Sequence, residues 1–164
     1  MIIQNKRIRI YKQTSFIIIG LVFFLFSCNN KIAISDSDEI DNNIWAIDTI
    51  VKSEVNIEDI SKFYNVFINV NVKEDFLTNN LWLFINTKSP IGNVQSDTLL
   101  FYITNEKGKW FGNKSGSVIS NKFLYKSNIK FPKAGEYTFL ISHGMREKDL
   151  PKVTEVGVTI EEVL

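Results

Sequence analysis

The sequence contains a single cysteine, Cys28, whose position points to a specific modification. It follows Leu25, Phe26 and Ser27 directly. A thiol can form a thioether with a lipid, and the short side chain of Ser27 suits a peptidase that cleaves between Ser27 and Cys28. These four residues resemble a bacterial lipobox. A lone cysteine elsewhere in a chain is more often a small buried core residue. Here we expect a covalent lipid on Cys28, and no other cofactor.

The residues before Cys28 have the order of a signal peptide. A basic head is followed by the run 16–26, which has ten apolar residues and one glycine. A membrane-spanning helix needs about 20 apolar residues, so this run is too short for one and matches a signal-peptide core. A buried helix of a globular domain would be the alternative, but this position behind a basic head does not favour it. We predict that residues 1–27 are a lipoprotein signal peptide.

Removal of the signal peptide changes the charge of the chain. The 164-residue sequence has a net charge of +1, but four of its 19 basic residues precede Cys28 and none of its 18 acidic residues does. The remaining 137 residues therefore carry a net charge of −3. This balance argues against a nucleic-acid-binding protein. Residues 28–43 are polar and acidic and predict a flexible acidic tether, followed by a single domain over 44–164.

Residues for catalysis are scarce in this chain. His143 is the only histidine and Cys28 the only cysteine, so neither a histidine-based metal site nor a cysteine-rich zinc site can form within one chain. Any Ser-His-Asp triad would need His143, and the sequence lacks a Gly-x-Ser-x-Gly elbow. A pair of carboxylates brought together by folding stays open. We expect no enzyme activity, no catalytic residues and no metal.

Aromatic residues offer a possible binding role. The three tryptophans Trp45, Trp82 and Trp110 could stack on sugars or anchor a protein partner, whereas core packing is the alternative for each. Trp82 lies inside an apolar run, which predicts burial. Trp110 lies between turn signals and fits either role. The candidate binding patch is Trp110, Arg146 and Trp45.

Alternating apolar and polar residues dominate the chain after the tether. Residues 64–72 place Tyr64, Val66 and Ile68 on one face with asparagines on the other, which is typical of a half-buried strand. Similar alternation marks 137–142 and 156–161. The apolar runs 81–85 and 99–103 have strand length and predict strands covered on both faces. Shorter strands are predicted at 44–47 and 129–131, and one helical turn at 56–62.

Seven or eight short strands separated by turns favour an all-β fold. We predict an antiparallel β-sandwich of the Ig-like Greek-key or jelly-roll kind. Tyr137, two residues after Gly135 and at the start of an alternating strand, is typical of a tyrosine corner, in which the hydroxyl binds a crossing loop.

The order of several motifs resembles the GldH family of gliding-motility lipoproteins from Bacteroidetes. The resemblance covers nearly the whole chain and includes the lipobox, Trp45, the segments 64–68, 96–99 and 108–112, Phe131-Pro132 with Gly135 and Tyr137, Met145-Arg146, and 156–160. It implies a cell-envelope lipoprotein that is needed for surface gliding and linked to type IX secretion. No catalytic residues are known for the family.

Two functions remain open at this point. The first is a non-catalytic accessory lipoprotein, held by its lipid anchor at the outer membrane, that binds other envelope proteins of the gliding or secretion machinery. The second is a carbohydrate-binding lipoprotein of the cell envelope, suggested by the aromatic residues.

Overall fold

The computed structural model describes residues 33–163 of the chain. The predicted signal peptide 1–27, the cleavage site at Ser27 and the lipid site at Cys28 lie outside the described residues. The described residues belong to one compact unit with its own apolar core, as expected of a domain that folds by itself. Within residues 33–163, no helix has the length and apolar character needed to cross a membrane.

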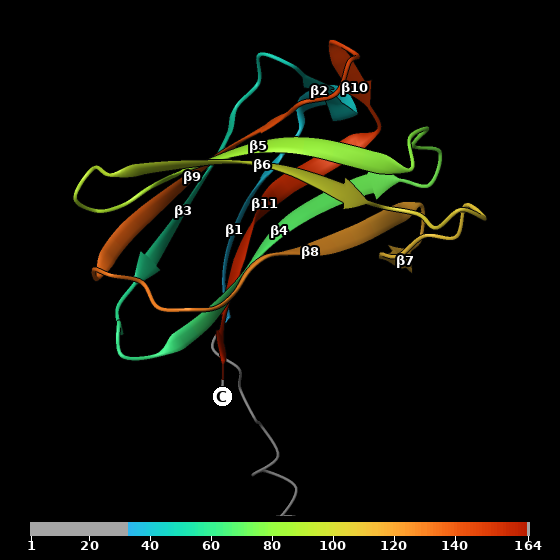
Figure 1. The fold of residues 1–164 in the computed structure, drawn as a ribbon. Coiled ribbons are helices and arrows are strands. Elements are labelled where there is room, and N and C mark those ends of the chain that lie inside the picture. The colour runs from blue at the N-terminus through green and yellow to red at the C-terminus, as the bar shows by residue number, and fades with distance from the viewer. Residues whose placement is uncertain (1–32, 164) are drawn as a thin grey trace, which may run out of the picture. The chain divides into compact units, whose positions relative to one another are not determined.

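The compact unit is a β-sandwich (Figure 1), as predicted, and every strand pairing among residues 33–163 is antiparallel. One sheet has the order β1-β11-β4-β8-β7 and the other β3-β9-β5-β6, while β10 and β2 form a small third sheet. The described part of the chain contains eleven strands rather than seven or eight: β1 Ala33–Glu39, β2 Ile44–Ala46, β3 Val51–Ile57, β4 Phe63–Lys73, β5 Asn80–Lys88, β6 Val94–Tyr102, β7 Asn113–Ser115, β8 Val118–Ile129, β9 Gly135–His143, β10 Asp149–Pro151 and β11 Val153–Val163.

The strands with the clearest alternation occupy the middle of the sheets, as predicted. In β4, alternate residues from Tyr64 to Val72 are buried. Alternate residues of β9 from Tyr137 are buried too, as is the 156–160 segment of β11. Because side chains of a strand point alternately to its two faces, each of these strands contributes one face to the core between the sheets.

The two apolar runs differ from the prediction, since they are covered on one face only. In β5, Leu81, Leu83 and Ile85 point into the core, whereas Trp82 and Phe84 are 41% and 45% exposed. In β6, the 99–102 segment is half-buried or exposed throughout. The sheet that contains β5 and β6 packs against a partner sheet on one side only, so the expected burial of Trp82 is wrong.

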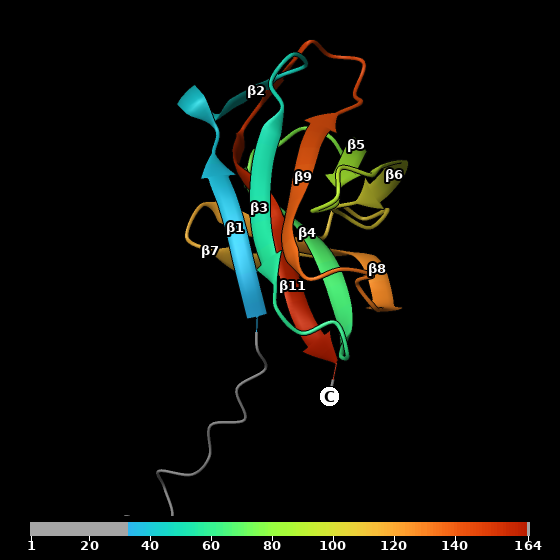
Figure 2. The same ribbon diagram turned by 90° about the vertical axis from the view of Figure 1, so that its left-hand side faces the viewer.

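The chain is already structured from residue 33, so the predicted flexible tether over 28–43 is wrong for its larger part. β1 pairs with β11 from Ala33–Glu161 to Glu39–Glu155 and is followed by a 3-10 turn, η2, at Asp41–Asn43. Figure 2 shows β1 beside β3, at the edge where the two sheets meet. There the Asp36 carbonyl accepts a hydrogen bond from Ser53 Oγ (3.2 Å), and its carboxylate accepts one from the Glu54 amide (2.6 Å).

A glycine in β11 lets β1 approach this closely. A Cβ atom at Gly157 would lie 2.4 Å from the Asp36 carbonyl oxygen and 2.5 Å from the Ser37 Cα atom. Real Cβ atoms do not come this near to backbone, so any larger residue would push β1 away from β11.

Other elements also differ from the prediction. Residues 56–62 form the end of β3 and a turn instead of a helical turn, and residue 129 ends the long strand β8 instead of starting a separate one. Buried and exposed residues alternate regularly in β3, but one of the buried residues is Ser53, so the sequence does not show a regular apolar–polar alternation. β7 and β10 have three residues each, too few to show a period.

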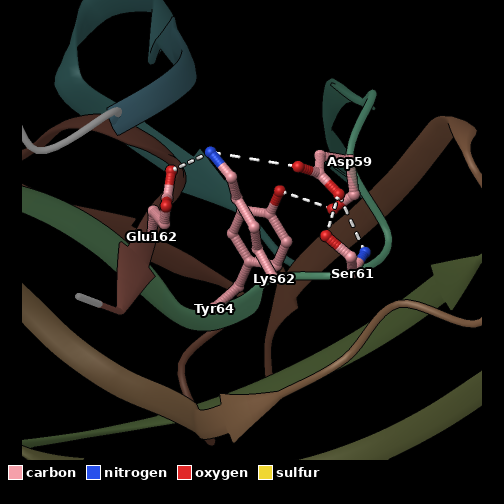
Figure 3. Close-up of polar contacts among 5 residues, drawn as sticks. All are labelled: Asp59, Ser61, Lys62, Tyr64 and Glu162. Carbon is pink, nitrogen blue, oxygen red and sulfur yellow. Dashed lines mark hydrogen bonds and ion pairs between the residues drawn. The ribbon is translucent and has the colours of Figure 1, made fainter.

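Two tyrosine hydroxyls fix the loops at the end of the sandwich where β1 begins. The Tyr137 hydroxyl donates a hydrogen bond to the Lys133 carbonyl (2.9 Å), which confirms the predicted tyrosine corner. The Tyr64 hydroxyl donates to the Asp59 carbonyl (2.8 Å) in the loop between β3 and β4 (Figure 3). In the same loop Lys62 pairs with Glu162 of β11 (2.8 Å), so the loop is tied to both neighbouring strands.

Candidate functional site

The most distinctive surface of the domain is the outer side of the four-stranded sheet. Trp82 and Phe84 of β5 and Tyr102 of β6 are exposed there, and Leu100 lies directly opposite Trp82 in the strand register. We call these four residues, together with Met145, the aromatic face. An antiparallel sheet with one side in solvent normally carries polar residues on that side, so this apolar surface is unusual.

The loop after β9 positions the aromatic side chains. The Gly144 amide donates a hydrogen bond to the Trp82 carbonyl (2.7 Å). A Cβ atom at Gly144 would lie 2.8 Å from a ring carbon of Phe84, so glycine leaves the space that the ring occupies. The Met145 sulfur lies 3.3 Å from the Trp82 amide nitrogen and accepts its hydrogen bond. The loop thus packs against both aromatic residues of β5.

A recess of about 340 Å³ lies beside Trp82. Its lining combines an indole ring with an amide, a guanidinium group and a carboxylate, contributed by Asn80, Trp82, Gly144, Met145, Arg146 and Glu147. Aromatic residues with methionine and arginine are enriched at protein interfaces. A ring flanked by hydrogen-bonding groups can also stack on a sugar. The arrangement therefore suits binding by contact and hydrogen bonds.

The structure does not bring the predicted patch of Trp110, Arg146 and Trp45 together. Trp45 is 0% exposed, donates its indole hydrogen bond to the Thr49 carbonyl (3.0 Å), and belongs to the core, so its predicted place on the surface is wrong. Trp110 is half-buried against the core and forms a bridge with Thr104. Only Arg146 lies in the recess next to an exposed tryptophan, and that tryptophan is Trp82.

His143 lies in the core beneath this surface. Its ring contacts Trp45 edge to face, with centroids 5.3 Å apart, and the Met145 amide donates to its Nδ1 atom (3.4 Å). Burial lowers the pKa of His143 below its ordinary value of 6.5, because the charged form loses hydration. Across residues 33–163 there is no group of three His, Cys, Asp or Glu side chains that could hold a metal ion.

The uniformly apolar character of the run 81–85 predicts burial on both faces and does not reveal the exposure of Trp82 and Phe84. A finer signal is present in the same residues. Aliphatic side chains occupy positions 81, 83 and 85, and aromatic ones occupy 82 and 84. This separation by type has the period of a strand and distinguishes a tightly packed core face from an aromatic outer face.

Comparison with known proteins gives a consistent result. The family model described as GldH lipoprotein matches residues 33–160. The chain is 34% identical over 153 residues to a protein of Christiangramia forsetii named gliding motility lipoprotein GldH homolog, covering 89% of this chain and 93% of that protein. It is 29% identical over 157 residues to the gliding motility lipoprotein GldH of Flavobacterium johnsoniae, covering 92% and 97%.

Proposed function

The chain belongs to the GldH lipoprotein family of gliding-motility lipoproteins, and we propose that it is a non-catalytic accessory component of the gliding machinery that acts by binding other envelope proteins. In this proposal its lipid anchor on Cys28 holds it at the outer membrane, and its partners belong to the gliding apparatus or the linked type IX secretion machinery. The aromatic face is the contact surface.

The exposure of the aromatic face is the observation that carries the proposal. Trp82, Phe84 and Tyr102 hold apolar surface in water, where it weakens solubility and adds nothing to the core. Tryptophan, tyrosine and arginine are also the residues that contribute most binding energy at protein interfaces. The aromatic face and Arg146 supply all three types on one side of the domain.

The test is crosslinking in living cells. In the double variant Trp82→Ser/Tyr102→Ser, we expect loss of most crosslinks to gliding or secretion proteins, and loss of colony spreading in an organism that glides. The matched control is Leu124→Ser, because Leu124 is 52% exposed and lies on β8 of the other sheet. Unchanged crosslinks in the double variant, with the protein folded and present at normal level, would overturn the proposed contact surface.

Carbohydrate binding is the second candidate, and the recess beside Trp82 favours it. Asn80, Arg146 and Glu147 place hydrogen-bonding groups around the indole ring. If a glycan binds there, titration with it quenches tryptophan fluorescence, and Arg146→Ala weakens binding at least tenfold. A glycan array without hits would remove this candidate and leave protein binding as the function of the face.

A further inference from the structure

A second hollow lies inside the sandwich, away from the aromatic face. Its volume is about 390 Å³. Its walls are mainly apolar and include Val66, Ile129 and Phe139, and its rim includes residues of the β5–β6 turn and of the loop between β8 and β9. Ligand cavities in proteins span roughly 300–1,000 Å³, so this one fits a single narrow apolar group.

The cavity exists because the two sheets are joined by strand contacts at one edge only. At the β1–β3 edge the hydrogen bonds of Asp36 with Ser53 and Glu54, each of which involves one side chain, join the two sheets. On the opposite side β6 and β8 lie in different sheets and meet through side chains. Phe101 stacks on Phe123 with ring centroids 4.5 Å apart. Further along the strands, toward the β5–β6 turn, the side chains leave the cavity open.

A half-buried polar group lies beside the cavity, and two of its members, Tyr125 and Lys126, line it. The Tyr125 hydroxyl donates a hydrogen bond to the Asp97 carboxylate, and Lys126 Nζ lies 3.2 Å from the same carboxylate. The hydrogen bond from Tyr125 and the charge of Lys126 lower the pKa of Asp97, so its negative charge is retained and neutralised within this group. Asp97 therefore leaves little uncompensated negative charge beside the cavity.

The rim of the cavity carries positive charge. Lys130 and Lys133 are exposed and line the cavity, and within residues 33–163 neither forms an ion pair with a carboxylate. The Lys130 ammonium group lies 4.7 Å from the ring centre of Phe63, which keeps it at the surface. Apolar walls with two lysines at the opening are complementary to a molecule with an apolar tail and an anionic head.

We propose that this cavity binds the acyl chain of an anionic amphiphile, with its carboxylate or phosphate head group at Lys130 and Lys133. The volume admits one chain, so the ligand is a fatty acid, a single-chain phospholipid or one tail of a membrane lipid. This proposal does not depend on the role of the aromatic face.

The position of the cavity matches a lipid source. β1 begins at the same end of the sandwich at which β8 ends, because Ala33 pairs with Glu161, Glu162 with Tyr64, and Tyr64 with Ile129. Cys28 lies five residues before Ala33 in the sequence. Five residues span at most roughly 18 Å. A lipid on Cys28 therefore limits how far this end can lie from a bilayer.

Titration calorimetry on a chain of residues 31–164 tests the binding directly. With dodecanoate below its micelle concentration, we expect saturable binding of one molecule per chain. The variant Lys130→Glu/Lys133→Glu should bind at least tenfold more weakly. Lys107→Glu/Lys109→Glu, at exposed positions in the β6–β7 connection, makes the same charge change and should bind dodecanoate normally. Absence of saturable binding, or equal loss in both variants, overturns the proposal.

A variant that fills the cavity separates tail binding from adsorption to charged surfaces. Ile129 is half-buried and lines the cavity, so Ile129→Trp should block the chain while leaving the lysines in place. If Ile129→Trp abolishes dodecanoate binding at an unchanged melting temperature, the cavity is the binding site. If the variant unfolds, NMR of the unsubstituted chain locates the site instead, because dodecanoate in the cavity should shift the methyl signals of Val66 and Ile91. If folded Ile129→Trp still binds dodecanoate, the cavity is not the binding site.

The same variants distinguish the two sources of the ligand. With vesicles of phosphatidylglycerol in place of dodecanoate, binding lost in Ile129→Trp indicates capture of a bilayer lipid tail. Dodecanoate binding without such vesicle binding indicates a free fatty acid. If dodecanoate does not bind, and vesicle binding is weakened by Lys130→Glu/Lys133→Glu but not by Ile129→Trp, the protein only adsorbs electrostatically to the vesicles. That result overturns the proposal.

Discussion

The hydroxyl groups of Tyr64 and Tyr137 show how single atoms hold the loops of this domain. Each ring lies in the core while its hydroxyl reaches a loop carbonyl four or five residues earlier. Both rings contact Phe131, at centroid distances of 5.6 and 4.7 Å. The loop that Tyr137 holds lines the proposed acyl cavity, and Tyr137 is itself one of the lining residues.

Removal of the Tyr137 hydroxyl should weaken the domain measurably. We expect Tyr137→Phe to lower the free energy of unfolding by about 1 kcal/mol, since it removes the hydrogen bonds that the hydroxyl donates to the Lys133 carbonyl and accepts from the Lys133 amide. Urea denaturation measures the change. Tyr102→Phe is the control because that side chain is 56% exposed, and an effect as large there would contradict the explanation.

His143 should make stability depend on pH. Its pKa is lowered in the folded protein, so between that value and about 6.5 the unfolded chain binds a proton that the folded chain does not. Stability is then complete above pH 6.5 and falls as the pH decreases through this window. Urea denaturation of His143→Asn from pH 7.5 to 5 should show a flatter dependence. If His143→Asn leaves the pH dependence of the free energy of unfolding unchanged, groups other than His143 cause that dependence.

Single residues of this chain are predictable from sequence where the motif that contains them is local. Tyr137 could be identified from a glycine two residues earlier and an alternating strand after it. The burial of Trp45 has no such local signal, because it depends on which strands lie opposite each other. For Trp82 the only local signal is the separation of aliphatic from aromatic residues over 81–85, and the apolar character of the run alone predicts burial.

Strand β1 is the element that most changes the picture of the domain. Its polar and acidic residues predict a flexible tether, yet it pairs with β11 along its whole length. A strand at the edge of a sheet has solvent on one side and needs few apolar residues. Ile34 alone packs against the core. Central strands such as β4 and β9, by contrast, must bury every second residue, and this made them predictable.

The packing of β1 gives a prediction for Gly157. In Gly157→Val the new side chain would overlap the Asp36 carbonyl, so we expect β1 to detach and stability to fall by about 1–3 kcal/mol. Hydrogen exchange at the amides of residues 35–38 should rise with it. Thr98→Val, on an exposed position of β6, serves as control and should change stability by less than about 0.5 kcal/mol. Protected β1 amides in Gly157→Val would contradict the prediction.

At the scale of the whole molecule, the sandwich presents two surfaces with different chemistry. The aromatic face lies on the outer side of one sheet, while the lysine-rimmed cavity opens at the end where the chain enters β1. The all-β class was predictable from alternation and turn spacing. The positions of the aromatic face and of the lysine-rimmed cavity were not predictable, because they depend on how the two sheets stack.

The lipid on Cys28 remains a prediction that membrane fractionation can test. In Cys28→Ala we expect the protein to leave the membrane fraction, because an unacylated chain loses the apolar tails that hold it. The control is Ser117→Ala, which leaves the lipobox intact. A Cys28→Ala protein that still sediments with membranes, and is not released by carbonate, would mean that another part of the chain anchors it.

The pairing of β1 with β11 also bears on how the protein is made. Ala33 meets Glu161, so the first described strand finds its neighbour only after nearly all of the domain has been synthesised. Contacts this distant in sequence form slowly. β11 also lies between β1 and β4 in the sheet, and a chain cut short before it would lose a central strand. If the chain is exported with a lipid on Cys28, as proposed, β1 stays unpaired until β11 has left the translocation machinery, and only then can the domain close.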